Sequence, residues 1–169
     1  MVLAQQLGQR AFPVHIVTAE FCLKGEYRVR GVLHVNLNNE LLKTLSLYDV
    51  QAQALDPHNV AGQMNAAEVV IARHLCELVI FAERPSHDDF IVMANAQPVI
   101  AYTSRFAVRG TAYLSGSPRL ADLLEDVKGY FVPVGDAQIF PLFPLRASVP
   151  RQSPFVLLYH EQVRMLHAR

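Results

Sequence analysis

The sequence has little of what several protein classes require. It contains no tryptophan and only two cysteines, and its 15 basic and 15 acidic side chains give a formal net charge of +0. A protein that binds nucleic acid mainly through bulk positive charge needs a basic excess, which is missing here. Two isolated cysteines supply neither a disulfide framework nor a zinc cluster. The chain is nevertheless 51% hydrophobic and 18% charged, a composition that excludes a disordered protein and indicates a packed core.

Targeting and membrane signals are also missing from the printed sequence. The N-terminal residues lack the basic start and apolar core of a secretory signal. The longest charge-free stretch, residues 90–104, is interrupted by Asn95 and Gln97, and a membrane helix needs roughly 20 mostly apolar residues. Cys22 and Cys76 lie in apolar runs and are interpreted as reduced core residues. We therefore expect a cytoplasmic protein with no membrane partner.

Motifs of catalysis and of cofactor binding are absent as well. The sequence has no GxSxG elbow, no phosphate-binding glycine loop and no HExxH spacing. We therefore assign no catalytic, cofactor-binding or metal-binding residue and expect no enzyme. Asp49 and Asp136 are interpreted as caps of a turn or bulge, because aspartate accepts local backbone hydrogen bonds. A small hydrolase or isomerase that uses His74 or His160 is a third, minor alternative.

The same order of features occurs twice along the chain. A strand with an Arg-Gly pair, Tyr27–Val35, returns as Phe106–Leu114, which aligns Gly31 with Gly110. Each strand is followed by a leucine-rich segment, a strand with Asp-x-Gln, a polar loop and an apolar strand. The last match aligns His74 with His160. We interpret this order as an internal duplication, and such repeats organise a whole fold.

The duplication predicts a mainly β protein of two tandem, small, antiparallel five-stranded barrels, each with a short helix between strands two and three. The barrels are expected over residues 12–84 and 88–169. Alternating apolar residues and turn signals predict the elements within them. A turn is predicted at 24–26, and strands are predicted at 26–35, 44–55, 68–81, 90–102, 130–140 and 155–166. One helix is predicted to be capped by Asn38 or Asn39, with Leu41, Leu42 and Leu45 on its apolar face. A second helix is predicted to begin at Ser117 and Pro118, with Leu120, Leu123 and Leu124 on its apolar face.

Bent strands with a glycine in the second strand resemble the Sm-like family. The segments Val29–Leu33 and Leu47–Val50 are similar to the glycine-bearing second strand and the Asp-containing third strand of that family. Val70–His74 is a partial match to the motif that joins its last two strands. The resemblance implies a small barrel and RNA binding, and of the RNA-contacting positions it carries over only Arg73 and His74.

The second repeat departs from the family pattern. The stretch Leu157–Glu161 lacks the Arg-Gly pair, and the leucine-rich helix differs from the usual Sm loop. The pattern of Gly110, Arg119–Leu124 and Asp136 is more similar to uncharacterised bacterial Sm-like domains. A resemblance in fold does not by itself define a function.

The first functional hypothesis is a non-enzymatic interaction or scaffold protein. Small barrels have exposed edge strands that pair readily with another chain. The apolar stretch at residues 140–145, which we expect in a loop, is typical of a contact surface. This hypothesis places the interface at Phe140, Leu142, Phe143 and Leu145. The expected partner is a second copy of the chain or another protein.

The alternative is an Sm-like protein that binds RNA or single-stranded nucleic acid through Arg73 and His74. The C-terminal end supports it with Arg146, Arg151, Arg164 and Arg169 against one acidic residue. The first repeat instead carries 6 basic and 8 acidic residues, which argues against a continuous basic surface. Complementary charge at the two ends also suggests head-to-tail contacts between copies. No cofactor is expected under either hypothesis.

Overall fold

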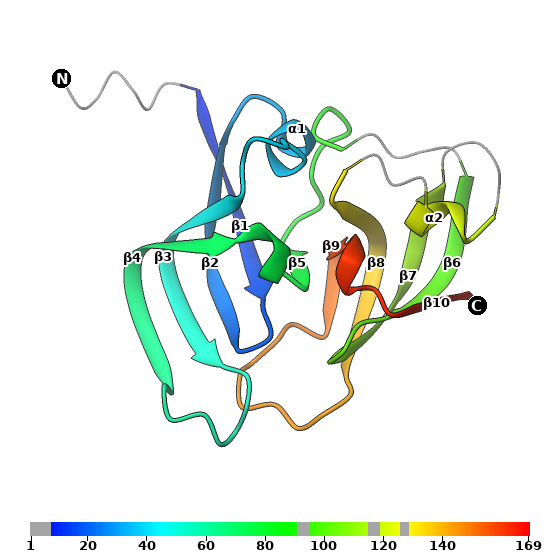
Figure 1. The fold of residues 1–169 in the computed structure, drawn as a ribbon. Coiled ribbons are helices and arrows are strands. Elements are labelled where there is room, and N and C mark those ends of the chain that lie inside the picture. Colours follow the sequence, from blue (N-terminus) through cyan, green and yellow to red (C-terminus); the bar gives the residue numbers. More distant parts are fainter. Residues whose placement is uncertain (1–7, 91–94, 115–118, 126–128) are drawn as a thin grey trace.

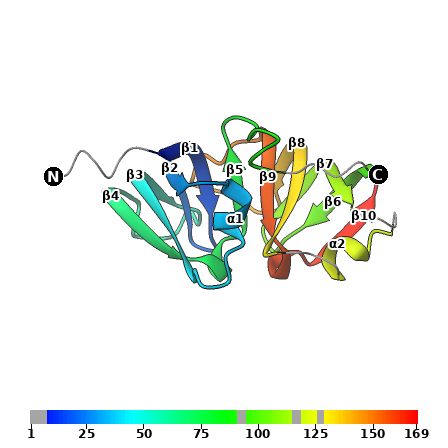
Figure 2. The same ribbon diagram turned by 90° about the horizontal axis from the view of Figure 1, so that it is seen from above.

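The structure is a computed structural model that describes residues 8–90, 95–114, 119–125 and 129–169. Ten antiparallel strands form one sheet in the order β10-β6-β7-β8-β9-β5-β1-β2-β3-β4. The first half of the molecule, β1–β5, and the second half, β6–β10, therefore repeat the same strand order. Figure 1 shows both halves strongly curved, and Figure 2 shows β5 and β9 at the centre with β4 and β10 toward opposite ends. Among the described residues, no helix is long and apolar enough to cross a membrane.

Each half contains five strands, a short α-helix and a 3₁₀ turn. The elements of the first half are β1 (Gln9–Val17), β2 (Phe21–Arg30), α1 (Leu33–Leu37), β3 (Thr44–Ala54), β4 (Gln63–Ala72), η2 (Arg73–Leu75) and β5 (Leu78–Phe81). Those of the second half are β6 (Asn95–Tyr102), β7 (Phe106–Leu114), α2 (Asp122–Glu125), β8 (Phe131–Pro141), β9 (Gln152–Tyr159), η3 (His160–Gln162) and β10 (Met165–Ala168).

The mainly β class and the antiparallel pairing agree with the sequence prediction, but the prediction of two closed barrels is wrong. In the first half, β4 pairs with β3, and β5 pairs with β1 and with β9 of the second half. The strand that would close the first barrel thus joins the two halves instead. The result is one open sheet with β4 and β10 at its ends.

Both long apolar strands of the prediction are in fact two strands. The predicted strand at 68–81 is broken by η2, and that at 155–166 by η3. The 3₁₀ turns redirect the chain from one edge of each half to the other. The predicted strand at 90–102 is observed as β6 from Asn95, and part of it lies outside the described residues.

The start of the predicted repeat is also placed wrongly. The turn between β1 and β2 is at Thr18, whose hydroxyl accepts a hydrogen bond from the backbone N–H of Phe21 at 3.1 Å. Residues 24–26 lie inside β2 instead. That strand ends at Arg30, because Gly31 has a φ of +80°.

The first helix comes earlier than the leucines predicted. α1 buries Leu33 and Leu37, one helical turn apart, whereas Leu41 is largely exposed and Leu45 belongs to β3. A second helix is present but is shorter than predicted, since α2 begins at Asp122 and Leu120 precedes it. Leu123 is buried, and Leu120 and Leu124 pack against the same core. The predicted cap at Ser117 and Pro118 lies outside the described residues.

The two halves bend at equivalent β-bulges. Asp49 and Asp136 have φ of 53° and 49°, a left-handed conformation that aspartate tolerates better than most residues. Opposite them, a Cβ on Gly25 would lie 2.8 Å from the Tyr48 carbonyl oxygen, and one on Gly110 would lie 2.6 Å from that of Gly135. Glycine allows this close approach of two strands. The two aspartates thus lie at bulges as predicted, but among the described residues their carboxylates pair with the side chains of Arg28 and Arg84 rather than with local backbone N–H groups. The alignment of Gly31 with Gly110 is wrong, because Gly25 holds the position of Gly110.

Two hydrophobic cores lie on the two faces of the central strands. Alternate side chains of β5 and β9 enter different cores, as expected when residues along a strand point to opposite faces. Leu78 and Ile80 of the first half pack into the core of the second half. Phe155 and Leu157 of the second half pack into the core of the first. The junction between the halves is thus built like the interior of a domain.

Candidate assembly interface

The internal junction is an antiparallel strand pair that runs from Leu78 opposite Leu158 to Phe81 opposite Phe155. All four residues of β5 are buried. The rings of Phe81 and Phe155 pack edge to face, with their centroids 5.7 Å apart. Strand addition at this place therefore combines backbone hydrogen bonds with apolar burial on both faces.

Glu77, directly before β5, connects the junction to the turn between β6 and β7. Glu77 is 3% exposed, and its Oε1 accepts a hydrogen bond from the backbone N–H of Arg105 at 3.2 Å. Burial raises the pKa of the Glu77 carboxyl, while hydrogen bonds from the Thr103 hydroxyl and the Arg105 N–H, and the Arg105 charge, oppose that rise. A side chain of the first half is thus held by the backbone of the turn between β6 and β7 of the second half.

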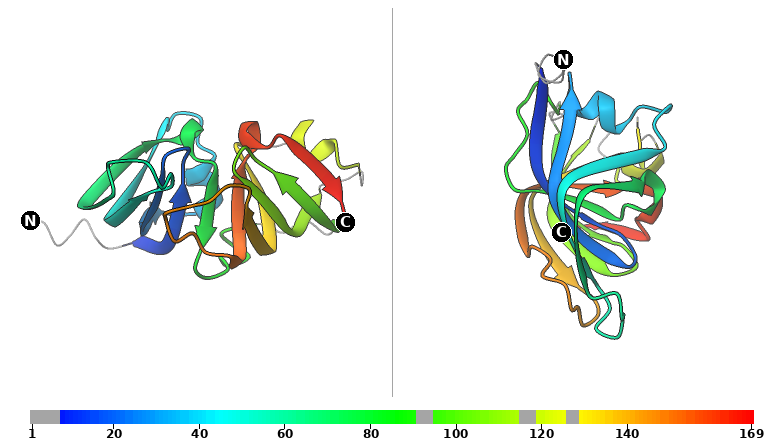
Figure 3. Two further views of the ribbon diagram at one scale, coloured as in Figure 1. Left: turned by 90° about the horizontal axis from the view of Figure 1, so that it is seen from below. Right: turned by 90° about the vertical axis from the view of Figure 1, so that its left-hand side faces the viewer.

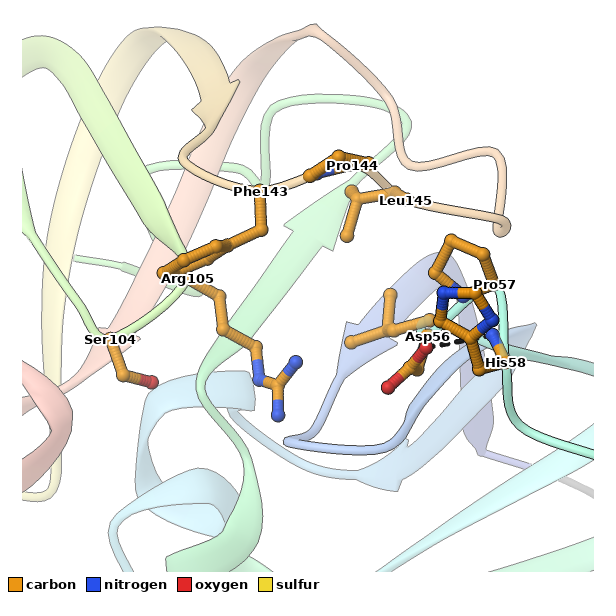
Figure 4. Close-up of a pocket in the computed structure, with 9 residues that line it drawn as sticks. Asp56, Pro57, His58, Ser104, Arg105, Phe143, Pro144 and Leu145 are labelled. Carbon is orange, nitrogen blue, oxygen red and sulfur yellow. Dashed lines mark hydrogen bonds between the residues drawn. The ribbon is translucent and has the colours of Figure 1, made fainter.

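The loop after β8 closes one side of the junction. Its Arg146 N–H donates to the Leu55 carbonyl at 2.8 Å, and Arg146 Nη1 donates to the Asn59 carbonyl at 2.9 Å. A shallow pocket lies beneath this loop, between the two halves (Figure 4). It is lined by Leu55, Asp56, Pro57, His58, Ser104, Arg105, Phe143, Pro144 and Leu145.

The four predicted interface residues differ in their place in the fold and in their exposure. Phe140 belongs to β8 and not to a loop. Phe143 and Leu145 face the pocket of the internal junction, and Leu145 packs against the core of the second half. Phe140, Leu142 and Phe143 are exposed, so part of the predicted apolar surface remains open to solvent.

Arg73, predicted to contact RNA, is 3% exposed. Its Nη1 donates to the carbonyls of Leu37 at 3.2 Å and Asn39 at 2.6 Å. Its guanidinium carbon lies 3.6 Å from the centroid of the Tyr130 ring. These contacts give Arg73 a structural role, because it satisfies the carbonyls at the end of α1 and packs against the second half.

His74 is exposed next to Arg73, and its carbonyl accepts a hydrogen bond from Gln162 Nε2 at 3.2 Å. Its predicted counterpart, His160, instead begins η3 at the position that Arg73 holds in η2. The ring Nδ1 of His160 lies 3.1 Å from the Tyr130 carbonyl. The two histidines therefore occupy different places and do not form an equivalent pair.

The free edges of the sheet carry exposed apolar residues at positions that are buried in the internal junction. Met165 begins β10 as Leu78 begins β5, and their exposed fractions are 53% and 0%. On the opposite edge, Val70 of β4 holds the position of Leu157 in β9, with exposed fractions of 60% and 0%. These edges lie far apart at the two ends of the molecule (Figure 3).

Nothing in the described part of the chain forms a metal site, since no three side chains of His, Cys, Asp or Glu come together there. Burial raises the pKa of both cysteine thiols to about 12, so Cys22 and Cys76 stay protonated and are poor nucleophiles. The two open edges are a feature that the sequence did not locate, because strand pairing between distant segments leaves no local signal.

No protein-family model, curated protein or solved structure matches the chain.

Proposed function

We propose that this protein is a non-enzymatic scaffold whose copies join head to tail, with β10 of one copy paired to β4 of the next. The observation that carries this proposal is the internal junction. There, the last strand of the first half pairs with the fourth strand of the second half. Because both halves have the same strand order, the molecule repeats the two members of that pair at its ends, where they have no strand partner among the described residues.

The internal register transfers directly to the pairing between copies. Leu78 lies opposite Leu158 and Val79 opposite Leu157. The equivalent residues place Met165 opposite Ile71 and Leu166 opposite Val70 of the next copy. Such a contact uses two different surfaces, so it is heterologous and extends to a ring or a filament.

The apolar residues at the edges support burial by a second copy. Leu78 and Ile80 pack into the core of the neighbouring half, and Met165 would enter the next copy in the same way. Two positions are more polar than their buried counterparts, since His167 replaces Ile80 and Glu68 replaces Phe155. The contact between copies is therefore weaker than the internal junction and depends on concentration.

The Sm-like resemblance remains part of this proposal. It is supported by a curved, antiparallel, five-stranded unit that occurs twice, each time with a short helix between its second and third strands. Binding of nucleic acid is not proposed, because Arg73, which was to contact RNA, is buried and already hydrogen-bonded.

Light scattering coupled to size-exclusion chromatography tests assembly over a range of concentrations. The chain has a mass of 18.9 kDa, and we expect larger multiples of it as the concentration rises. Val70→Lys places a charge on the β4 edge and is expected to shift the mass toward a single chain. Val35→Lys is the matched control, because Val35 is an exposed valine on α1. A single chain at every concentration would refute the proposal.

A further inference from the structure

The turn between β1 and β2 and the turn between β6 and β7 have the same hydrogen bonds. The Thr18 N–H donates to the Phe21 carbonyl at 2.9 Å, and the Thr103 N–H donates to the Phe106 carbonyl at the same distance. In each turn the threonine hydroxyl also accepts from the N–H two residues later, at 3.3 and 3.4 Å. Glu20 of the first half therefore occupies the position of Arg105 in the second.

The residues before β5 and β10 are equivalent as well. The Glu77 N–H donates to the Val17 carbonyl and the Arg164 N–H to the Tyr102 carbonyl, both at 2.7 Å. Arg164 thus holds the position of Glu77, and its side chain is exposed. Both members of the Glu77–Arg105 contact are replaced at the free edges by residues of opposite charge.

From this exchange we infer that Arg164 of one copy pairs with Glu20 of the next and selects the partner edge. The inference rests on the proposed assembly and adds the residues that make it specific. Inside the chain the Glu77 carboxylate of the first half accepts a hydrogen bond from the backbone N–H of Arg105 in the second half, and the positive charge of Arg105 also favours the ionised carboxylate. Between copies the basic residue comes from the second half and the acidic one from the first, so opposite charges meet in both junctions.

Charge-reversal variants of the full chain test the inference. Each of Glu20→Arg and Arg164→Glu is expected to raise the protein concentration needed for half-assembly by about tenfold or more, because like charges then meet. The double variant restores opposite charges in reversed order and is expected to return within about threefold of the wild type. Glu40→Arg, at an exposed position between α1 and β3, is the control and leaves assembly unchanged.

The possible outcomes separate this inference from the proposed function. If the wild type assembles and both single variants assemble equally well, the charge pair is refuted while edge pairing stands. Single variants that both weaken assembly without recovery in the double variant also overturn the pairing. A wild type that remains a single chain at all concentrations refutes both proposals.

Discussion

Arg73 allows a quantitative test of how the two halves are held together. Its guanidinium satisfies the carbonyls of Leu37 and Asn39 and lies over the ring of Tyr130. Arg73→Ala removes the side-chain donor of the buried Leu37 carbonyl, which costs about 1–3 kcal/mol. The Asn39 carbonyl is part-buried and keeps its hydrogen bond from the Leu42 N–H. Loss of a desolvated cation–π contact adds about 2 kcal/mol. We expect the free energy of unfolding to fall by about 3–5 kcal/mol, a large fraction of the stability of a typical domain.

The assay is guanidinium-induced unfolding followed by far-UV circular dichroism and by tyrosine fluorescence, since the chain has six tyrosines and no tryptophan. His74→Ala is the matched control, because its side chain is exposed and its hydrogen bond to Gln162 uses the backbone carbonyl. That variant is expected to change stability by less than about 0.5 kcal/mol. Arg73→Lys keeps the charge but not the planar fork and should lie between the two. An Arg73→Ala variant within about 1 kcal/mol of the wild type would refute the structural role.

Three further predictions concern stability. Gly110→Ala should lower the denaturation midpoint more than Gly31→Ala. An added Cβ at Gly110 collides with the backbone, whereas one at Gly31 enters open space and the only strain there comes from the positive φ. Equal losses in the two variants would contradict the close strand approach at the bulge. Burial raises the pKa of Glu77, so the stabilising contribution of the protonated carboxyl is present at low pH and is lost as the pH rises through its folded-state pKa. The free energy of unfolding, measured from about pH 4 to 8, should therefore fall with pH in the wild type and lose this part of the fall in Glu77→Gln. Burial opposes ionisation of Asp89, but hydrogen bonds from Arg10 and Ser86 outweigh it and lower its pKa. Its contribution is therefore present at neutral pH and lost on acidification, and acid unfolding of Asp89→Asn that retains the full wild-type slope would contradict this.

Local sequence patterns predicted the strands along which apolar and polar side chains alternate. β3 and β8 lie almost where the alternation placed them, because each has one face in the core and one in solvent. The same rule failed at residues 26–35. Leu33 and Val35 continue the alternation of β2, but Gly31 ends the strand and Leu33 packs with Leu37 on a helix.

The junction between the halves was not predictable from local patterns. The pairing of β5 with β9 joins segments more than 70 residues apart, and its register depends on both complete halves. The η2 and η3 turns were missed because apolar residues continue on both sides of them. Arg73 looked like an exposed binding residue in the sequence, and only the folded chain shows the carbonyls of Leu37 and Asn39 that it satisfies.

Disulfide trapping tests the pairing of β10 with β4 most directly. Ile71→Cys and Met165→Cys combined in one chain place the new thiols at opposite ends of the same sheet, so a bond between them must join two copies. The native Cys22 and Cys76 are buried. In the proposed register the two residues lie directly opposite each other on adjacent strands, where Cα atoms are about 4.5–5.5 Å apart. This distance falls within the range of about 4.4–6.8 Å that a disulfide requires. Mild oxidation is expected to give a ladder of covalent multiples of the chain that neither single variant forms, whereas a double variant that stays a single chain would contradict head-to-tail assembly.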